Sequence, residues 1–416
     1  MHLRNVCQDT NRRHSQFAIR VGLLALALAL GILGSDLFAG VHFVGPSGSN
    51  QYSKMQTLSR STPWRTLQHA VNQLEPGDQI RVLDGTYYEH VWLPSSGQKG
   101  KWISLVADNR GGAKLVGSIS AQNRSYVLIK GLDVSNPDGD FVLTKGIAFS
   151  YSHHITIRGN IVHDCFGGGI SCDQSDSVVI DWNEVHHNAF WDGQQHSGIS
   201  VYQPQRRGPQ DDRFWGIVIR NNVCWGNQNL LDNPYWGRPT DGNGIVADDF
   251  KNLYAGGNGT VYDRWSVIEN NVCFQNGGQG VHCYQSANVY IRNNTCSENV
   301  FSFDFGGEVS VVDSDNVMVY NNILDASPGK YAALQYESSN YWFAYNLVNG
   351  SLRAMATGRG NLFGPPRFQE DSYRLLPDSP AINRGLTQNG LYPMDAAGNP
   401  RIVDGSLDIG AYEFGW

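Results

Sequence analysis

The chain has 416 residues, and its 31 basic and 38 acidic side chains give it a formal net charge of −7. A mildly acidic chain without a stripe of Lys and Arg is not typical of nucleic-acid-binding proteins, so no nucleic acid is expected as a partner. The 47 Gly residues favour a fold in which many tight turns join short strands.

Residues 1–39 have the layout of a secretory signal peptide. Basic residues up to Arg20 precede an apolar run at residues 21–30, and a small-residue boundary follows at Leu37–Ala39. A membrane anchor is the alternative, but the run is short for a span of about 20 residues. The sequence therefore predicts a secreted or periplasmic protein with no stable membrane span once the signal peptide is removed.

Residues 40–125 are expected to form an N-terminal cap and the first coils of the repeat region that follows. Short strands are predicted at residues 42–44, 79–83 and 103–107, and a short helix at residues 62–71. A repeat array needs such a cap because its terminal unit would otherwise expose an open edge. The helix is therefore predicted to cover the open end of the core.

A repeated phrase characterises residues 126–375. Each copy has a short alternating apolar segment, then an Asn and a small apolar residue, as in Ile217–Val223 and Val289–Thr295. Successive Asn residues are separated by 23, 39, 49, 23, 28 and 24 positions. A period near 23 is typical of a solenoid in which each repeat forms one coil. The Asn residues are Asn160, Asn183, Asn222, Asn271, Asn294, Asn322 and Asn346.

Each coil is predicted to contain two strands, one before the Asn and one after a Gly. The second strands follow Gly146, Gly169, Gly198, Gly244 and Gly280. Apolar and other residues alternate in them, so every second side chain should point into the core. Parallel strands of successive coils lie about 4.8 Å apart, so equivalent side chains should form ladders. We expect the Asn ladder to be structural, with side chains bonded to the backbone at each turn.

Six Cys residues follow residue 39, and five of them fall at repeated positions. Cys224, Cys273 and Cys296 each come two residues after a repeat Asn, while Cys172 and Cys283 share a position in the second strand. We interpret them as small apolar residues of a narrow core. The absence of CxxC spacing argues against zinc, whereas a disulfide between stacked coils stays open because exported proteins can keep disulfides.

The repeats, the phrase Gly85–Glu89 and the closing phrase Leu407–Phe414 resemble bacterial right-handed parallel β-helix proteins of the pectate-lyase-like superfamily. The likeness covers nearly all of the chain after residue 39. It implies an all-β, right-handed parallel β-helix with an N-terminal capping helix, on which residues 376–416 pack. It implies no single activity, because this superfamily includes lyases, hydrolases, epimerases and non-catalytic adhesins.

The two long Asn-to-Asn gaps predict long loops within residues 184–263. They add roughly 16 and 26 residues to coils of 23, and such loops usually project from one face and border a groove. Their aromatic side chains suit stacking on the apolar faces of sugar rings, although they would equally pin the loops to the coils. The candidate sugar-binding residues are Trp191, Tyr202, Trp225, Tyr235, Trp236 and Tyr254, with Asp173 on a neighbouring coil.

Two outward rows are expected on the Gly-led strands. One row holds Asp173, Tyr202, Asp248 and Tyr284, and its neighbour holds Ser171, Ser200, Val246 and His282. Three acids, Asp241, Asp248 and Asp249, should gather near the groove, with His196 and His282 on flanking coils. Exposed acids are usually only solvated, and Asp-Gly often marks a turn. The concentration of acids and His beside the largest insertions nevertheless favours a functional site.

Two lyase mechanisms fit these residues. In the first, which resembles that of calcium-dependent pectate lyases, Ca²⁺ held by Asp241, Asp248 and Asp249 neutralises a uronate carboxylate and acidifies its C5 proton. Lys251 or a His then removes that proton. In a metal-free lyase or epimerase, His196 or His282 is the base, and Tyr202 or Tyr284 is the acid.

Hydrolysis is the second hypothesis. Asp248 and Asp249 are similar to the paired Asp of polygalacturonase-like glycosidases, which act as acid and base in an inverting reaction. The chain departs from that family because it lacks the Gly-His-Gly phrase and the Arg-Ile-Lys signature. A third hypothesis is a non-catalytic surface protein that binds polysaccharide. We expect an exported monomer that acts on an acidic polysaccharide, with lyase chemistry preferred.

Overall fold

The computed structural model describes residues 40–138, 144–209, 214–302, 306–353, 358–370, 372–388 and 390–415. The predicted signal peptide at residues 1–39 lies outside the described residues. Within the described ranges, no helix is long and apolar enough to cross a membrane.

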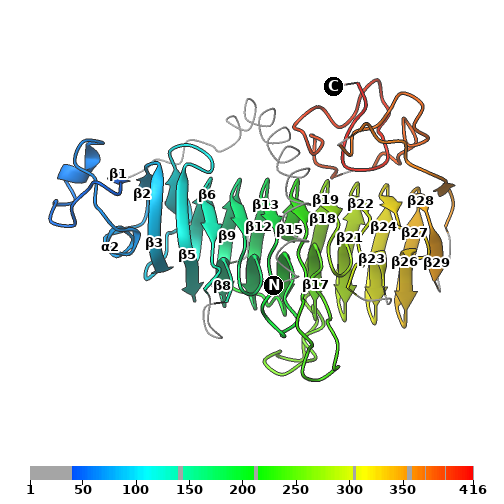
Figure 1. Cartoon of the computed structure of the whole chain (residues 1–416), viewed down its shortest axis with the longest axis horizontal. Coiled ribbons are helices and arrows are strands. Elements are labelled where there is room, and N and C mark those ends of the chain that lie inside the picture. The colour runs from blue at the N-terminus through cyan, green and yellow to red at the C-terminus, as the bar shows by residue number, and fades with distance from the viewer. Residues whose placement is uncertain are drawn as a thin grey trace, which may run out of the picture.

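Parallel strands stacked along one long axis make up most of the molecule (Figure 1). The strands form an eleven-stranded sheet and a nineteen-stranded sheet. The smaller sheet contains the strands that precede the repeat Asn. It consists of β1 (Val41–Val44), β2 (Gln79–Val82), β4 (Ile103–Ala107), β6 (Ser125–Lys130), β9 (His153–Arg158), β12 (Asp176–Asp181), β15 (Trp215–Arg220), β18 (Trp265–Glu269), β21 (Ala287–Arg292), β24 (Asp315–Tyr320) and β27 (Ser339–Ala344).

The larger sheet divides into two stacks that meet at the long strands β3 (Gly85–Trp92) and β5 (Ala113–Gln122). The short-strand stack consists of β7 (Asp133–Ser135), β10 (Ile161–His163), β13 (Glu184–His186), β16 (Val223–Trp225), β19 (Val272–Phe274), β22 (Thr295–Ser297), β25 (Ile323–Asp325), β28 (Leu347–Asn349) and β30 (Leu362–Phe363). The Gly-led stack consists of β8 (Ile147–Ser150), β11 (Ile170–Asp173), β14 (Ile199–Tyr202), β17 (Ile245–Asp248), β20 (Val281–Tyr284), β23 (Gly307–Val312), β26 (Tyr331–Tyr336) and β29 (Ser351–Arg353). A regular coil therefore has three strands, one more than the sequence predicted.

The Asn ladder is structural, as predicted. The Nδ2 of Asn183 donates to Oδ1 of Asn222 at 3.0 Å, and that of Asn222 donates to Oδ1 of Asn271 at 3.0 Å. The same Oδ1 of Asn271 accepts the backbone N–H of Asn222 at 3.0 Å. These side chains are fully buried, so each must satisfy its own hydrogen-bonding groups inside the protein. The ladder thereby fixes one corner of every coil.

A second Asn ladder, which the sequence analysis missed, fixes the corner before the Gly-led strands. Asn188 donates to Asn227, Asn227 to Asn276 and Asn276 to Asn299, from one coil to the next, at 2.8–2.9 Å. This ladder also helps to explain the Gly before several of these strands, at Gly169, Gly198, Gly244 and Gly280. A Cβ on Gly198 would lie 2.7 Å from Nδ2 of Asn227, which leaves no room for a side chain.

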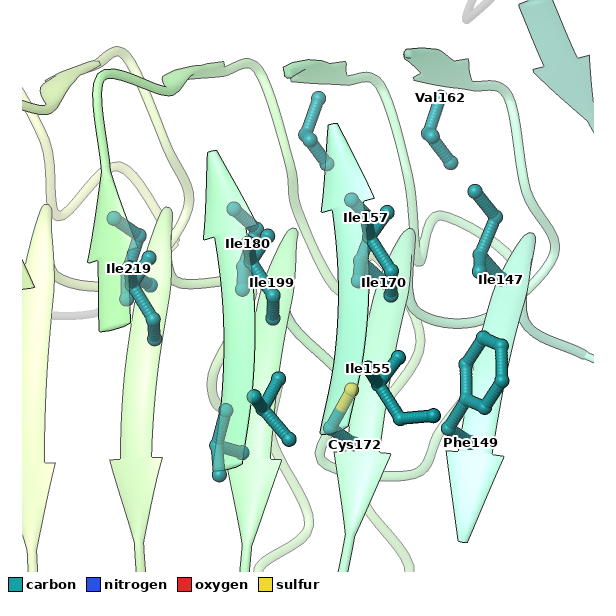
Figure 2. Packing of buried hydrophobic residues seen from close by; sticks show 14 of the residues in the cluster. Ile147, Phe149, Ile155, Ile157, Val162, Ile170, Cys172, Ile180, Ile199 and Ile219 are labelled. Atoms are coloured by element: carbon teal, nitrogen blue, oxygen red, sulfur yellow. The ribbon is translucent and has the colours of Figure 1, made fainter. Parts of the chain in front are cut away.

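Stacked Ile and Val side chains fill the interior between the sheets. Figure 2 shows Ile147, Ile170 and Ile199 in one column and Ile157, Ile180 and Ile219 in another. These side chains are fully buried, which confirms the predicted inward alternation. The six Cys of the described residues are buried and free, so they serve as core residues there.

The N-terminal end carries the predicted capping helix in shortened form. Helix α2 (Leu67–Val71) begins after Thr66 and not at residue 62, because Trp64 pairs in an extended conformation with Val44. The carboxylate of Glu89 accepts the first free N–H groups of α2, those of Leu67 at 2.8 Å and of Gln68 at 2.9 Å. Such capping satisfies donors that a helix leaves unpaired. One 3₁₀ turn, η1 (Gln56–Leu58), precedes α2.

Residues 372–388 and 390–415, which we call the tail, lie along the outside of the coils above the short-strand stack (Figure 1). Aromatic rings join the two parts: Tyr373 packs on Phe274 with ring centroids 4.9 Å apart. Hydrogen bonds from Asn221 to the Asp395 carbonyl and from Asn270 to the Met394 carbonyl measure 2.6 Å and 2.8 Å. The tail therefore covers one outer face of the coils.

Candidate functional site

The two predicted outward rows lie on the Gly-led stack, and the strand register confirms them. Asp173 pairs with Tyr202, Tyr202 with Asp248, and Asp248 with Tyr284. The neighbouring row runs Ser171, Ser200, Val246 and His282 in the same register. We call these outward side chains of β11, β14, β17 and β20 the ladder face. The longest loops begin or end at these strands, and green loops project from the lower edge of this region in Figure 1.

Asp248 is the central acid of the ladder face. Its carboxyl group makes no hydrogen bond or ion pair with any described residue. Burial raises the pKa of Asp248 well above its usual range, and the carboxylates of Asp241, Asp249 and Asp173 raise it further. Asp248 therefore keeps its proton to a higher pH than an ordinary Asp and can donate it.

Asp241 lies in the turn before β17, close to the ladder face. Its Oδ1 accepts a hydrogen bond from Nδ2 of Asn243 at 3.1 Å. Burial raises the pKa of Asp241 to about 6. Two neighbouring carboxyl groups thus have raised pKa values, a pattern typical of functional sites.

His196 belongs to a His–Asp pair in the preceding turn. Its Nδ1 lies 2.6 Å from Oδ2 of Asp192, whose side chain is almost fully buried. Burial would raise the pKa of Asp192, but the hydrogen bond and charge of His196, together with the N–H of Gln194 and the charge of Lys145, outweigh it and lower the pKa. A buried carboxylate on Nδ1 fixes the tautomer of the ring and leaves Nε2 to accept a proton. The carbonyl of His196 accepts the N–H of Gly242, which places the pair directly beside Asp241.

Lys145 supplies a cation that the sequence analysis missed. It immediately precedes Gly146, yet its Nζ reaches Oδ2 of Asp173 and Oγ of Ser171, both at 3.1 Å. Ser171 in turn donates to Oδ1 of Asp173 at 2.6 Å. Side chains of the turns before the Gly-led strands therefore extend over the ladder face. No repeat pattern marks Lys145, so only the fold could reveal it.

His282 and Tyr284 occupy the next coil. The His282 ring is stacked on Tyr284 with centroids 5.7 Å apart, and its buried Nδ1 has no partner among the described residues. Burial lowers the pKa of His282 to about 4, so the ring is neutral near pH 7. The hydroxyl groups of Tyr284 and Tyr254 lie 2.9 Å apart. These residues border the ladder face, but His282 is a weaker base than an unperturbed imidazole.

The structure corrects the role predicted for Asp249. It lies at a left-handed turn with φ 50°, where the alternation of the strand ends. Its carboxylate accepts hydrogen bonds from the N–H groups of Leu253 and Tyr254, both at 2.8 Å, and from Gln203 at 2.9 Å. The side chain is fully buried. Asp249 therefore anchors the loop after β17 and is not placed for catalysis.

The predicted calcium site of Asp241, Asp248 and Asp249 does not fit this arrangement. Ca²⁺ requires six to eight oxygen ligands, and both oxygens of Asp249 already accept N–H donors. Across the described part of the chain, no group of three or more His, Cys, Asp or Glu is arranged to hold a metal ion. We derive no step through calcium.

Lys251 is also wrongly assigned as a base. Its Nζ pairs with Asp315 at 2.8 Å and with Asp313 at 3.3 Å. Burial would lower the pKa of Lys251, but these two carboxylates outweigh it and raise the pKa. A base must be deprotonated near the working pH, and this pairing holds Lys251 in its charged form.

Of the predicted sugar-binding aromatics, Trp225 lies on the wrong face. It is 6% exposed and stacks on His186 with centroids 4.5 Å apart, next to Phe274 beneath the tail. In contrast, Trp191, Tyr235 and Trp236 are 56%, 88% and 63% exposed. Hydrogen bonds join their two loops, including one from Asn233 to the Gly193 carbonyl at 3.1 Å. Those three side chains are therefore available to a ligand.

Tyr202 stands between Asp173 and Asp248 on the ladder face. Its hydroxyl has no hydrogen-bond partner among the described residues. Burial and the nearby Asp248 carboxylate raise the pKa of Tyr202 to about 12, so it carries its proton at neutral pH. It is therefore able to act as a proton donor.

Comparison with known proteins agrees with this architecture. Residues 107–258 match the family model described as right handed beta helix region, and no curated protein matches the chain. Among solved structures, the chain is similar to pectate lyase Pel9A, with a TM-score of 0.55 and 16% identity over 90% of this chain and 96% of that one. It is less similar to an alginate lyase from Paenibacillus sp. str. FPU-7, with a TM-score of 0.42 and 17% identity over 65% and 94% of the two chains.

The family match and the likeness to Pel9A establish the fold. The chain is a right-handed parallel β-helix. At 16% identity the likeness to Pel9A is evidence for the fold and not for an activity. Evidence for function comes from the side chains of the ladder face and the turns beside it.

Proposed function

We propose that the protein cleaves an acidic, uronate-containing polysaccharide by β-elimination, on the ladder face. The observation that supports this most is the His196–Asp192 pair, with its 2.6 Å hydrogen bond. The pair lies beside Asp241, whose carboxylate in turn raises the pKa of Asp248. Elimination requires a base for the C5 proton, a group that stabilises the negative charge next to C5, and a proton donor for the leaving oxygen. The ladder face and the turn before β14 together offer one candidate for each role.

His196 is the proposed base. Asp192 holds Nδ1, so Nε2 is the nitrogen that takes the C5 proton, and the resulting positive charge is stabilised by the buried carboxylate. In its protonated form, Asp248 donates a hydrogen bond to the uronate carboxylate. This hydrogen bond withdraws negative charge from the carboxylate and makes the C5 proton easier to remove. The exposed aromatics Trp191 and Trp236 then stack on neighbouring sugars.

The elimination step balances as follows. The C5–H electron pair forms the C4=C5 double bond, the bond from C4 to the glycosidic oxygen breaks, and Tyr202 gives its hydroxyl proton to that oxygen. His196 ends protonated and Tyr202 ends as a phenolate. Transfer of the proton from His196 to Tyr202 through solvent restores both residues.

Hydrolysis is the second candidate, and one observation favours it. Asp241 and Asp248 are neighbouring carboxyl groups whose pKa values are both raised, Asp241 to about 6. Two carboxyl groups in different protonation states are what an acid–base glycosidase uses. In that case Asp248 would protonate the leaving oxygen, and Asp241 would activate water.

An activity screen separates these reactions. The protein from residue 40 onward would be incubated with pectate, alginate, glycosaminoglycans and neutral glycans, each with chelator and with added calcium. Ultraviolet absorbance of an unsaturated uronate, together with new reducing ends, on an acidic polymer in chelator is the expected result. Reducing ends without absorbance would establish hydrolysis, and binding without either signal would establish a binding protein.

We also propose that the protein is exported, since a polymeric substrate of this kind is met outside the cytoplasm and residues 1–39 have the layout of a signal peptide. N-terminal sequencing of the protein recovered from the secreted or periplasmic fraction tests this. A new N-terminus near residue 40 is expected, and recovery of the intact chain in the cytoplasm would contradict export.

A further inference from the structure

A second polar site lies at the corner that follows the Gly-led strands, toward the N-terminal end of the ladder face. We call it the corner pocket. It has a volume of 340 Å³, and its lining includes Arg124, Tyr151, His153, Arg206 and Arg207. None of the described residues that line it is acidic. Three guanidinium groups around one hollow produce a positive potential that favours an anion.

The guanidinium groups of two of these arginines have no carboxylate partner among the described residues, although the backbone N–H of Arg207 donates to Oδ2 of Asp176 at 3.1 Å. Arg124 donates only to backbone carbonyls, from Nε to Leu93 at 3.1 Å and from Nη1 to Asn123 at 3.3 Å. Arg206, by contrast, pairs with Asp263 at 2.6 Å. The neutral contacts of Arg124 hold its guanidinium in place without neutralising it.

Arg207 is positioned in the same way. Its Nη2 donates to Oε1 of Gln205 at 3.1 Å, and its guanidinium lies over the Tyr151 ring at 4.9 Å. The nearby carboxylate of Asp176 is already occupied by Arg264 at 3.0 Å and by the hydroxyl of Tyr262 at 2.5 Å. Burial lowers the pKa of Arg207, which reflects a positive charge that the protein compensates poorly.

The corner pocket is aligned with the ladder face. Tyr151 directly follows Ser150, and Ser150 pairs with Asp173 in the strand register. Asp173, Tyr202 and Asp248 then follow one another on successive strands. Three steps of about 4.8 Å place the pocket about 14 Å from Asp248 along the axis of the helix. A polysaccharide that lies along the ladder face would reach it after a few sugar units.

We propose that the corner pocket is a distal subsite in which Arg124 and Arg207 bind a carboxylate of the acidic polysaccharide. This inference rests on the proposed function and specifies its substrate, a polymer that carries carboxylates on sugars beyond the one that is cleaved. Planar guanidinium groups bind carboxylates with two parallel hydrogen bonds, which lysine cannot reproduce. The subsite would therefore favour long acidic chains over short ones.

Binding of defined oligosaccharides tests the proposal. Calorimetry on the His196→Gln protein, which should turn substrate over at least about 100-fold more slowly, would compare uronate hexamers with dimers, with carboxyl-reduced hexamers and with inorganic phosphate. The hexamer of the preferred uronate should bind about 10-fold to 100-fold more weakly after Arg124→Gln or Arg207→Gln, while the dimer is unaffected. Arg124→Lys should recover only part of the loss. Arg367→Gln, which breaks an exposed pair with Asp378, is the matched control and should change nothing.

Several results would overturn the subsite. The first is that the hexamer binds the wild-type pocket and all Arg variants with equal affinity. The second is that the carboxyl-reduced hexamer binds as tightly as the uronate hexamer. The third is that phosphate binds in an Arg-dependent way while the hexamer does not bind. Thermal melts of each variant exclude a folding defect as the cause of lost binding. Failure of the proposed function would give a different pattern. If the wild type bound the hexamer through Arg124 and Arg207 but formed no unsaturated product, the subsite would be supported and the lyase activity would be contradicted.

Discussion

On the face of the coils that the tail covers, buried charges occur in pairs, whereas on the ladder face the central acid stands alone. Arg292 pairs with Glu269 at 2.8 Å and Arg401 with Glu413 at 3.1 Å, with all four side chains nearly fully buried. Asp248 has no such partner among the described residues, and its pKa is raised by burial and by its acidic neighbours. Both faces belong to the same coils.

This difference separates structural polar groups from functional ones. A buried charge that is paired and hydrogen-bonded contributes to a stable interface, and removing one partner is strongly destabilising. An acid held among other acids costs stability, and such an arrangement is typical of sites that bind or react. The repeat therefore builds one face that the tail covers and a second, the ladder face, whose central acid has no partner among the described residues.

The largest effect is expected on the covered face. Trp225→Ala should lower the free energy of unfolding by about 3–5 kcal/mol, because it empties a space between His186, Phe274 and the tail. Denaturant titration measures this change. Activity per folded molecule should stay within about twofold of wild type, since the indole of Trp225 lies beneath the tail and not on the ladder face. A loss of activity with unchanged stability would contradict this and would place Trp225 at the reacting site.

The next largest effect is expected on the ladder face. His196→Gln should lower kcat by about 100-fold or more, because a general base contributes about 10²–10⁴ to the rate. Its free energy of unfolding should change by less than about 1 kcal/mol, since the ring is partly exposed and has one side-chain partner, Asp192. Steady-state kinetics and denaturant titration measure the two effects separately. The matched control is His90→Gln, whose side chain bonds to Ser118 on the N-terminal coils and should leave kcat unchanged.

The sequence predicted the ladder face because inward and outward residues alternate along each Gly-led strand, starting again at each Gly. The rows that contain Asp248 and His282 therefore followed from spacing alone. The third strand of each coil was missed because three residues, as in Ile161–His163, are too few to show an alternation. Trp225 was misplaced because a sequence cannot tell which outer face of a coil the tail will cover.

Other errors arose where the chain leaves the strands. Asp249 was assigned to the site because it follows Asp248, but its left-handed turn directs the carboxylate into a loop. Asp192 and Lys145 were missed because they lie in turns outside the repeat, and only the folded coils bring them to His196 and Asp173. Periodicity predicts residues within strands, whereas side chains of the turns depend on the three-dimensional path of the chain.

A smaller effect should separate the two faces by pH. The pKa of Asp241 is raised to about 6 in the folded protein, against about 3.9 in an unfolded chain. Folding disfavours the ionised form of Asp241. The free energy of unfolding of the wild type is therefore not reduced by Asp241 below about pH 4, and it falls by the contribution of this one group as the pH rises through about 6. Asp241→Asn should remove this loss, which amounts to about 3 kcal/mol at most.

Unfolding free energies measured between pH 4 and pH 7 test this sign. The two proteins should be similar at the acidic end, and the variant should be relatively more stable at pH 7. A wild type that gains stability relative to Asp241→Asn over this range would show that Asp241 is a paired, structural acid like those beneath the tail.

The most direct test of the account is the proton NMR spectrum of the products formed from the preferred polyuronate in the presence of chelator. The account predicts the signal of a vinylic proton at C4 of a new non-reducing end with the wild type, and its loss with His196→Gln. Saturated ends alone would contradict β-elimination, and a vinylic signal that persists at the wild-type rate in His196→Gln would remove His196 from the role of base.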